Sequence, residues 1–242
     1  FRRVLFRSKG KRGKFIKMPR FPFDKFADAN NALSTQMKAT GEVMSIGRSF
    51  EESLLKGIRS LEIGLFHLHH KKFDNCSTKE LLDYIHIGTD DRIYAIGELL
   101  RRGTDVDAIH DKTDIDRFFL RKMRNIIRME EELAGTTPVS DTDGNPVLSD
   151  EQRNLLYRSK RMGFADREIA LLWNMTERSV YELRKKERIL PVYKMIDTCA
   201  SEFESYIPYF YSTYEDENES VVSEKRKIVV LGSGPIRIGQ GV

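Results

Sequence analysis

The chain contains 242 residues, of which 40% are hydrophobic and 32% charged, and its mean hydropathy is −0.48. This length allows one large domain or two small ones, and no apolar run approaches the roughly 20 residues that a membrane span needs. Much of the net charge of +4 comes from residues 1–17, which lack the continuous apolar stretch and cleavage site of a secretory signal. We therefore exclude a membrane protein and expect a cytosolic one.

Apolar stripes at helical spacing dominate the chain from Ser49 onward. Ser49 and Glu52 form a capping-box pattern, and the stripe that follows continues to Gly64. The same features predict further helices at residues 77–85, 93–103 and 118–135, and one that starts at Ser149. These segments together predict a helical bundle.

A turn-rich segment, TTPVSDTDGNPVL, separates two of these helices and contains several potential calcium ligands. Asp141, Asp143 and Asn145 have the spacing found in calcium-binding loops. Pro146, however, stands where such a loop needs glycine, and Gln152 stands where it needs a bidentate glutamate. We therefore expect a loop without calcium.

A histidine cluster and two cysteines raise the question of a metal site. His67, His69 and His70 suit neither one helix face nor the paired spacing of zinc ligands, and Cys76 does not complete a set of four. We expect solvent-exposed histidines and no metal. Cys76 and Cys199 lie far apart without a disulfide framework, so we expect reduced, buried thiols.

Residues 164–186 are predicted to form two short helices joined by a turn, which is typical of DNA-binding helix-turn-helix proteins. Arg178, Arg184 and Lys185 on the second helix would then contact DNA. Glutamates on the same helix offset this charge, and such helix pairs also pack small helical domains. A helix-turn-helix regulator stays as the alternative to our main expectation, in which the chain binds no nucleic acid.

The C-terminal part contains a short β-branched run followed by a glycine-rich turn. Residues 228–231 predict a buried parallel strand that leads into Gly232 and Gly234. A dinucleotide-binding turn needs glycine where Arg237 stands, Pro235 removes a backbone donor, and no Walker lysine follows. What remains is a tight turn where the backbone comes close to another surface, with Arg237 available to an anion or for packing.

Four long segments in a fixed order resemble the large subunit of carbamoyl-phosphate synthase. They are IKMPRFPFDKF with TGEVMSIGR, then KTDIDRFFLRKMRNIIRMEE, then PVYKMIDTCASEFESYIPYFYSTYE, and finally KIVVLGSGPIRIGQGV. The resemblance covers residues 16–242, and the opening FRRVLFRSKGKRGKF does not share it.

The resemblance implies two homologous ATP-grasp halves joined by a helical oligomerisation domain. Residues 16–64 would be the tail of the first half, residues 65–220 the oligomerisation domain, and residues 221–242 a linker and the start of the second half. Residues 1–15 would be non-native or disordered. The expected fold is thus mainly α, with a short remnant of an α/β domain on the N-terminal side and the first strand of another at the C-terminus.

The resemblance also implies an activity for the complete protein. That protein would be an ATP-dependent ligase that makes carbamoyl phosphate from bicarbonate, ammonia and two ATP, for pyrimidine and arginine synthesis. It would use ATP with Mg or Mn, and K, and a partner small subunit would release the ammonia from glutamine. This chain would hold no catalytic residue and bind no cofactor; it would join the two halves and self-associate through its helices.

One group of residues is a candidate site under this resemblance. The turn would lie towards the channel that carries ammonia or carbamate, so the turn residues would line or support it: Gly232, Gly234, Pro235, Arg237 and Gly239. Gly234→Leu in the complete enzyme would then uncouple glutamine hydrolysis from carbamoyl phosphate output.

Overall fold

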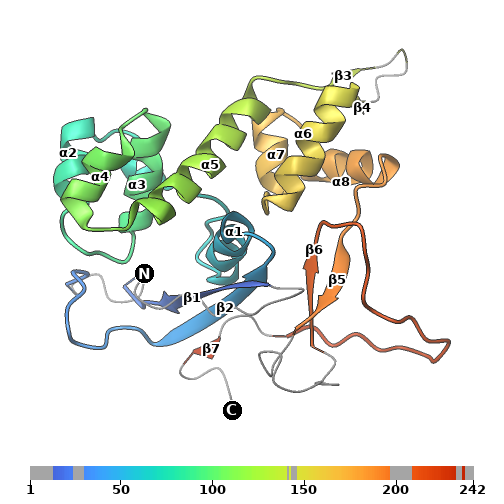
Figure 1. Cartoon of the computed structure of the whole chain (residues 1–242), viewed down its shortest axis with the longest axis horizontal. Coiled ribbons are helices and arrows are strands. Elements are labelled where there is room, and N and C mark those ends of the chain that lie inside the picture. Colours follow the sequence, from blue (N-terminus) through green and yellow to red (C-terminus); the bar gives the residue numbers. More distant parts are fainter. Residues whose placement is uncertain are drawn as a thin grey trace.

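The computed structural model describes residues 13–23, 30–140, 142, 146–196, 209–232 and 236–237. The fold is mainly helical, as predicted, with short strands towards both ends of the chain (Figure 1). The α-helices are α1 (Phe50–Ser60), α2 (Thr78–Tyr84), α3 (Arg92–Arg101), α4 (Val106–Thr113), α5 (Arg117–Ala134), α6 (Asp150–Arg161), α7 (Asp166–Leu172) and α8 (Glu177–Lys186), and Lys71–Phe73 forms a 3₁₀ turn.

The predicted helix starts agree with the observed caps. Ser77 and Ser149 each form a complete capping box at the start of α2 and α6. Ser49 caps α1 by accepting from the backbone N–H of Glu52, but the Glu52 carboxylate accepts from the backbone of Arg48 instead of closing the box. Helix α4 was not predicted from the sequence, because its eight residues bury only two apolar side chains.

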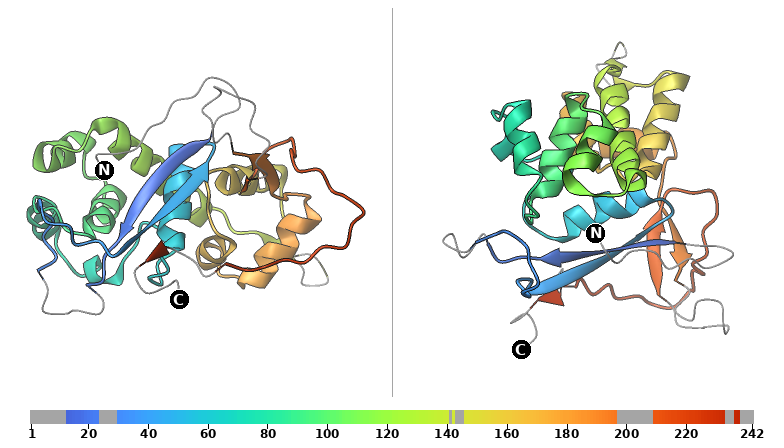
Figure 2. Two further views of the ribbon diagram at one scale, coloured as in Figure 1. Left: turned by 90° about the horizontal axis from the view of Figure 1, so that it is seen from below. Right: turned by 60° about the vertical axis from the view of Figure 1, so that its left-hand side comes forward.

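An antiparallel sheet has the strand order β1 (Lys14–Arg20), β2 (Gly41–Gly47), β7 (Ile236–Arg237). Helix α1 packs on one face of this sheet, where Ile16 and Val43 are buried, and the helices lie on that side of it (Figure 2). The C-terminal β7 pairs with the N-terminal β2, so segments from both ends of the chain meet in one sheet. Strand β1 begins inside the segment 1–15, and residues 1–12 lie outside the described part.

Two further strand pairs flank the last helices. Strands β3 (Val139–Ser140) and β4 (Pro146–Val147) close the loop before α6, and β5 (Val192–Met195) pairs with β6 (Phe210–Thr213). The side chains of Asn218 and Glu219 accept hydrogen bonds from backbone N–H groups of β5. The outer edge of β5 is therefore covered by the acidic segment 215–219.

A continuous apolar core runs through the helices, and α5 is its centre. Helix α5 contacts α1, α3, α4, α6 and α7, and it buries Leu120, Met123, Ile126, Ile127, Met129 and Leu133. Trp173, at the end of α7, is also fully buried and donates its indole N–H to the carbonyl of Leu133 at 3.1 Å. Helix α5 thus joins the α2–α4 group to the α6–α8 group.

The predicted buried strand at residues 228–231 is wrong. This run is coil, and its four side chains are 81–92% exposed. A strand of this kind needs neighbouring strands and covering helices, and the exposure of these four residues shows that the described elements do not cover them. Among the described residues after 213, the strand is β7, which pairs with β2 through Ile236 and Arg237.

Candidate functional site

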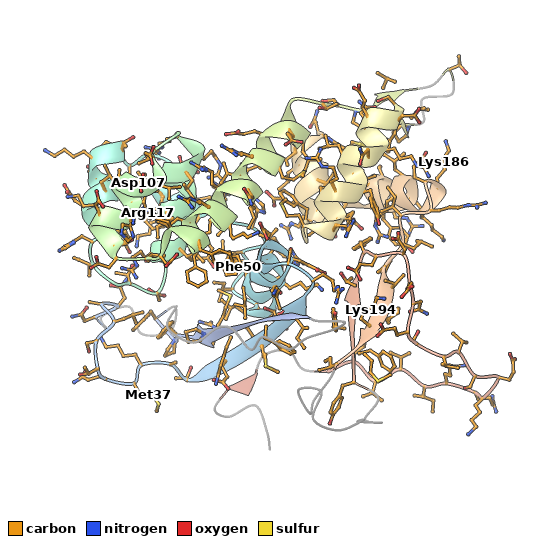
Figure 3. The ribbon with its side chains drawn as sticks, viewed as in Figure 1. Met37, Phe50, Asp107, Arg117, Lys186 and Lys194 are labelled. Atoms are coloured by element: carbon orange, nitrogen blue, oxygen red, sulfur yellow. The ribbon has the colours of Figure 1, made fainter. Side chains whose placement is uncertain are left out.

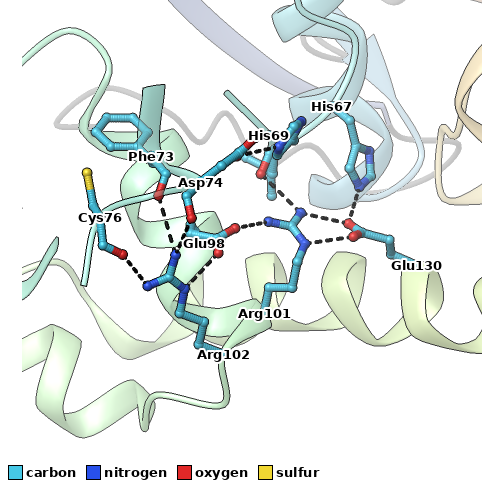
Figure 4. Close-up of polar contacts among 10 residues, drawn as sticks. His67, His69, Phe73, Asp74, Cys76, Glu98, Arg101, Arg102 and Glu130 are labelled. Carbon is cyan, nitrogen blue, oxygen red and sulfur yellow. Dashed lines mark hydrogen bonds and ion pairs between the residues drawn. The ribbon is translucent and has the colours of Figure 1, made fainter. Parts of the chain in front are cut away.

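A network of partly buried charges fixes the α2–α4 group to α5 (Figure 4). Arg101 of α3 donates from Nε and Nη2 to the two carboxylate oxygens of Glu130 of α5, at 2.7 and 2.9 Å. The remaining donors of Arg101 reach Glu98 at 2.8 Å and the carbonyl of Leu68 at 3.3 Å. His67 contacts the same Glu130 carboxylate through Nε2 at 3.0 Å. Every charge in this network has an opposite charge beside it.

The electrostatics of this network favour the ionised form of Glu130. Burial by itself would raise the pKa of Glu130, but hydrogen bonds from Arg101 and His67 outweigh it and lower the pKa to about 2. The bidentate geometry of the arginine explains the strength of the effect. We name Arg101, Glu130, Glu98 and His67 the Arg101 network.

The histidine and cysteine predictions are partly corrected here. His67 is buried at 3% exposure rather than exposed, because it packs on Phe164 and contacts Glu130. His69 is exposed, as predicted, and contacts Asp74. Among the described residues, no group of side chains is arranged to hold a metal ion.

Cys76 is free but only partly buried, so the prediction of a buried thiol is wrong for this residue. Its backbone carbonyl accepts from Arg102, whose guanidinium also reaches the carbonyls of Phe73 and Asp74. The segment before α2 is thus held by an arginine rather than by cysteine chemistry. Cys199 lies outside the described residues.

A second buried network lies among α6, α7 and α8. Asp166 of α7 accepts from Lys160 of α6 at 2.7 Å and from Nε of Arg184 of α8 at 2.8 Å. Lys160 also donates to the carbonyl of Phe164 at 2.7 Å, and Arg59 of α1 donates to the carbonyl of Gly163 at 2.7 Å. The cations outnumber the carboxylate that they surround.

In this second network, burial and the neighbouring cations disfavour the ionised form of Lys160. Burial lowers the pKa of Lys160 to about 8, although Asp166 acts in the other direction, and Arg184 adds a like charge. Tyr214, which follows β6, lies under Lys160 with its ring centroid 5.1 Å from the ammonium. Burial raises the pKa of Tyr214 to about 12. We name Lys160, Asp166, Arg184 and Tyr214 the Lys160 network.

Polar contacts also attach the β5–β6 pair to β2 and α1. Arg48, which follows β2, donates to Glu215 at 2.8 Å, and Lys56 of α1 donates to the carbonyl of Ser212 in β6. Lys194 of β5 lies 3.5 Å from Glu219 in the acidic segment (Lys194 is labelled in Figure 3). These contacts hold the chain that leaves the helices beside the chain that enters them.

The helix-turn-helix prediction is correct as geometry. Helices α7 and α8 are joined by a turn in which Asn174 has a φ of 51°. Arg184, however, is 8% exposed and bound to Asp166, so it cannot reach DNA as predicted. Arg178 is exposed and paired with Glu182 at 2.5 Å. Nothing in this arrangement favours the DNA-binding alternative.

The two remaining predicted sites fall partly outside the described residues. Of the calcium candidates, Asp141, Asp143 and Asn145 lie outside, whereas Gln152 serves as the helix-capping residue of α6. Of the turn residues, Gly234, Pro235 and Gly239 lie outside. Gly232 lies in exposed coil with open space where a Cβ would stand, and the backbone of Arg237 pairs with Gly41 of β2. Their predicted role at the channel stays a prediction.

The helical region has a known counterpart. Residues 42–188 match the family model of the carbamoyl-phosphate synthetase large chain, oligomerisation domain. The match covers more than half of the chain. This protein belongs to that family. The matched region begins in β2 and ends just after α8, so it contains α1 to α8 and both charged networks.

The match confirms the family resemblance and the mainly helical fold that were predicted from the sequence. It also removes the need for a separate explanation of the α7–α8 pair, which lies inside the matched oligomerisation domain. In the part of the chain that the structure describes, no helix has the length and apolar character to cross a bilayer.

Sequence reasoning missed both buried networks, although a signal for them exists. Glu130 lies four residues after Ile126 and three before Leu133, and Lys160 lies four after Leu156, so both occupy the inward phase of an apolar stripe. A charged residue at such a phase must be paired or pay a desolvation cost. Their partners come from other helices, so the sequence alone did not reveal them.

Proposed function

We propose that this chain mediates self-association of the carbamoyl-phosphate synthetase large chain and links the segments that flank the helical region. The single observation that carries the proposal is the match of residues 42–188 to the oligomerisation domain of that family. The pairing of β7 with β2 supports the linking role, because it brings the two flanks of the helical region into one sheet.

The wider activity belongs to the same proposal. The complete protein would be a cytosolic ligase that makes carbamoyl phosphate from bicarbonate, ammonia and two ATP, for pyrimidine and arginine synthesis. It would need Mg or Mn, and K, and would receive ammonia from glutamine through a small subunit. This chain would contribute assembly and no catalytic group, and residues 221–242 would lead into the second synthetase half with the Gly232 turn beside its channel.

Co-purification tests the assembly role. Two copies of the 242-residue chain, one with a histidine tag and one with a streptavidin-binding tag, would be expressed together. We expect capture through one tag to retain the other copy in comparable amounts, because an oligomerisation module associates with itself. If capture through one tag recovers only the copy that carries this tag, even at high protein concentration, the proposal is contradicted.

A further inference from the structure

The chain that enters the helical region and the chain that leaves it meet along a seam between β2 and β6. We name β2 with α1 the entry segment, and β5, β6 and residues 214–219 the exit segment. In Figure 1, the β5–β6 pair stands beside the entry segment and below α8. Tyr211 of β6 is buried, and its ring centroid lies 5.7 Å from the ammonium of Lys56 in α1. The two segments are therefore in direct contact.

The ammonium group of Lys56 joins three elements at this seam. It contacts the carboxylate of Glu52 in the same helix at 2.7 Å and donates to the carbonyl of Ile46 in β2 at 2.9 Å. It also donates to the carbonyl of Ser212 in β6. An ammonium group has three protons, so each proton of Lys56 has an acceptor on a different element or turn. The donors of this lysine are fully used in holding β2, α1 and β6 together.

The carboxylate of Glu52 fixes the lysine in place. Glu52 is 1% exposed, and its second oxygen accepts from the backbone N–H of Arg48 at 2.6 Å. A Cβ at Gly47 would lie 2.8 Å from this carboxylate, and a Cβ at Gly163 would lie 2.8 Å from the Glu52 Cα. Glu52 is thus held closely between the end of β2 and the turn after α6, with no room to change its position.

Arg48 makes the second connection across the seam. Its backbone is bound to Glu52, and its guanidinium donates from Nε to Glu215 of the exit segment at 2.8 Å. The two cations that reach the exit segment, Arg48 and Lys56, are therefore both anchored on one buried carboxylate. We name Arg48, Glu52 and Lys56 the flank clamp.

The energetics of the flank clamp favour a positioning role over a stabilising one. Burial lowers the pKa of Lys56, although Glu52 acts in the other direction. A buried ion pair contributes little net stability when compared with apolar side chains of similar volume, because both ions must lose their water. Hydrogen bonds are directional, however, and each fixes its partner at one distance and angle. The clamp therefore determines where the exit segment lies more than how stable the fold is.

We propose that Arg48, Glu52 and Lys56 are positioning residues that set the exit segment in one place on the entry segment. This inference rests on the proposed linking role, and it names the residues that perform it. In the complete protein, the two synthetase halves continue from these two segments, so the flank clamp would align one half with the other. Loss of the clamp would then let the halves work out of step without unfolding the helical region.

Hydrogen exchange of the 242-residue chain measures the positioning. The variant Glu52→Gln with Lys56→Met removes both charges of the buried pair together and keeps the side-chain volumes, so we expect it to fold. The new amide can still accept from the Arg48 backbone. We expect the β5–β6 amides to exchange about tenfold faster or more relative to those of α5, because the seam loses its buried donor and opens locally more often.

Two further variants make the exchange experiment specific. Arg48→Met removes the contact with Glu215 but keeps the buried pair, so the same exchange ratio should rise by about threefold, less than in the double variant. Arg101→Met is the matched control, because it breaks a charged network away from the seam; it should not raise the exchange of β5–β6 relative to α5. An unchanged ratio in the double variant, or an equal rise in Arg101→Met, would overturn the proposal.

The complete protein provides a readout that a purely stabilising role would not change. We expect the ATP hydrolysed per carbamoyl phosphate formed to rise about twofold or more in Glu52→Gln with Lys56→Met, because misplaced halves lose the intermediate between them. The ratio should stay unchanged in Arg101→Met, since a smaller folded fraction lowers both quantities together. A ratio that stays unchanged in the double variant would overturn the alignment of the halves by the clamp.

Failure of the proposed function gives a different result. The exchange experiment uses dilute chain and does not depend on association, so a chain that fails to capture a second copy contradicts self-association and leaves the exchange result standing. An unmodified complete protein that makes no carbamoyl phosphate contradicts the wider activity and likewise leaves it standing. The clamp itself fails only through the exchange ratio or the ATP ratio of its own variants.

Discussion

The two buried networks contain the same kinds of side chain but balance their charges differently. In the Arg101 network, Glu130 and Glu98 surround the guanidinium, and the pKa of Glu130 falls to about 2. In the Lys160 network, Lys160 and Arg184 share Asp166, and the pKa of Lys160 falls to about 8. The first network therefore stabilises its ionised groups, whereas the second keeps a cation that burial disfavours. Burial alone does not determine whether a charge stabilises a fold; the number of partners does.

The largest expected effect comes from removing the arginine at the centre of the first network. Arg101→Met leaves the Glu130 carboxylate buried with His67 as its remaining partner, so we expect a loss of about 3–5 kcal/mol in the free energy of unfolding. Urea denaturation measures it. Arg178→Met, which breaks an exposed pair with Glu182, should cost less than about 1 kcal/mol. Equal losses for the two variants would contradict the distinction.

The matching substitution in the second network should behave differently. Lys160→Met removes a disfavoured cation and leaves Asp166 paired with Arg184, so we expect a change within about 1 kcal/mol of zero by the same measurement. Asp166→Asn, by contrast, leaves both cations without a carboxylate and should destabilise by about 3 kcal/mol or more. A loss for Lys160→Met as large as that for Arg101→Met would remove the contrast between the networks.

The free energy of unfolding should rise with pH in two separate ranges, because folding lowers the pKa of both Glu130 and Lys160. The folded-state pKa of Glu130 lies below its ordinary 4.5, so its contribution is present above pH 4.5 and is lost as the pH falls towards about 2, by about 3 kcal/mol. The folded-state pKa of Lys160 lies below its ordinary 10.5, so stability should rise between pH 8 and pH 10.5, where only the unfolded chain keeps the proton. Urea titrations at stepped pH would test both, and a rise that persists in Lys160→Met would contradict the second assignment.

The smallest expected effect concerns a helix start rather than a network. Ser77→Ala removes the capping box of α2, and we expect a loss of about 1 kcal/mol. Ser223→Ala lies in exposed coil and should change stability by less than about 0.5 kcal/mol. Thermal unfolding of the two variants side by side provides the comparison, and indistinguishable midpoints would show that the cap contributes nothing.

The sequence predicted those features whose interactions lie within a few residues of one another, and it failed for features that depend on distant parts of the chain. The starts of α2 and α6 and the end of α5 at Gly135 were predictable because the cap residues act within four positions. The run at 228–231 has a strand-like sequence but is exposed coil, since a strand depends on neighbours elsewhere in the chain. The charged networks were missed for the same reason, because Glu130 and Asp166 find their partners on other helices.

Sedimentation equilibrium of the unmodified 242-residue chain, over a hundredfold range of concentration and at low and high salt, tests the central claim most directly. We expect the apparent mass to rise above 28.1 kDa as the concentration rises. A mass that stays at 28.1 kDa at every concentration and salt would contradict the claim that this chain is an assembly module.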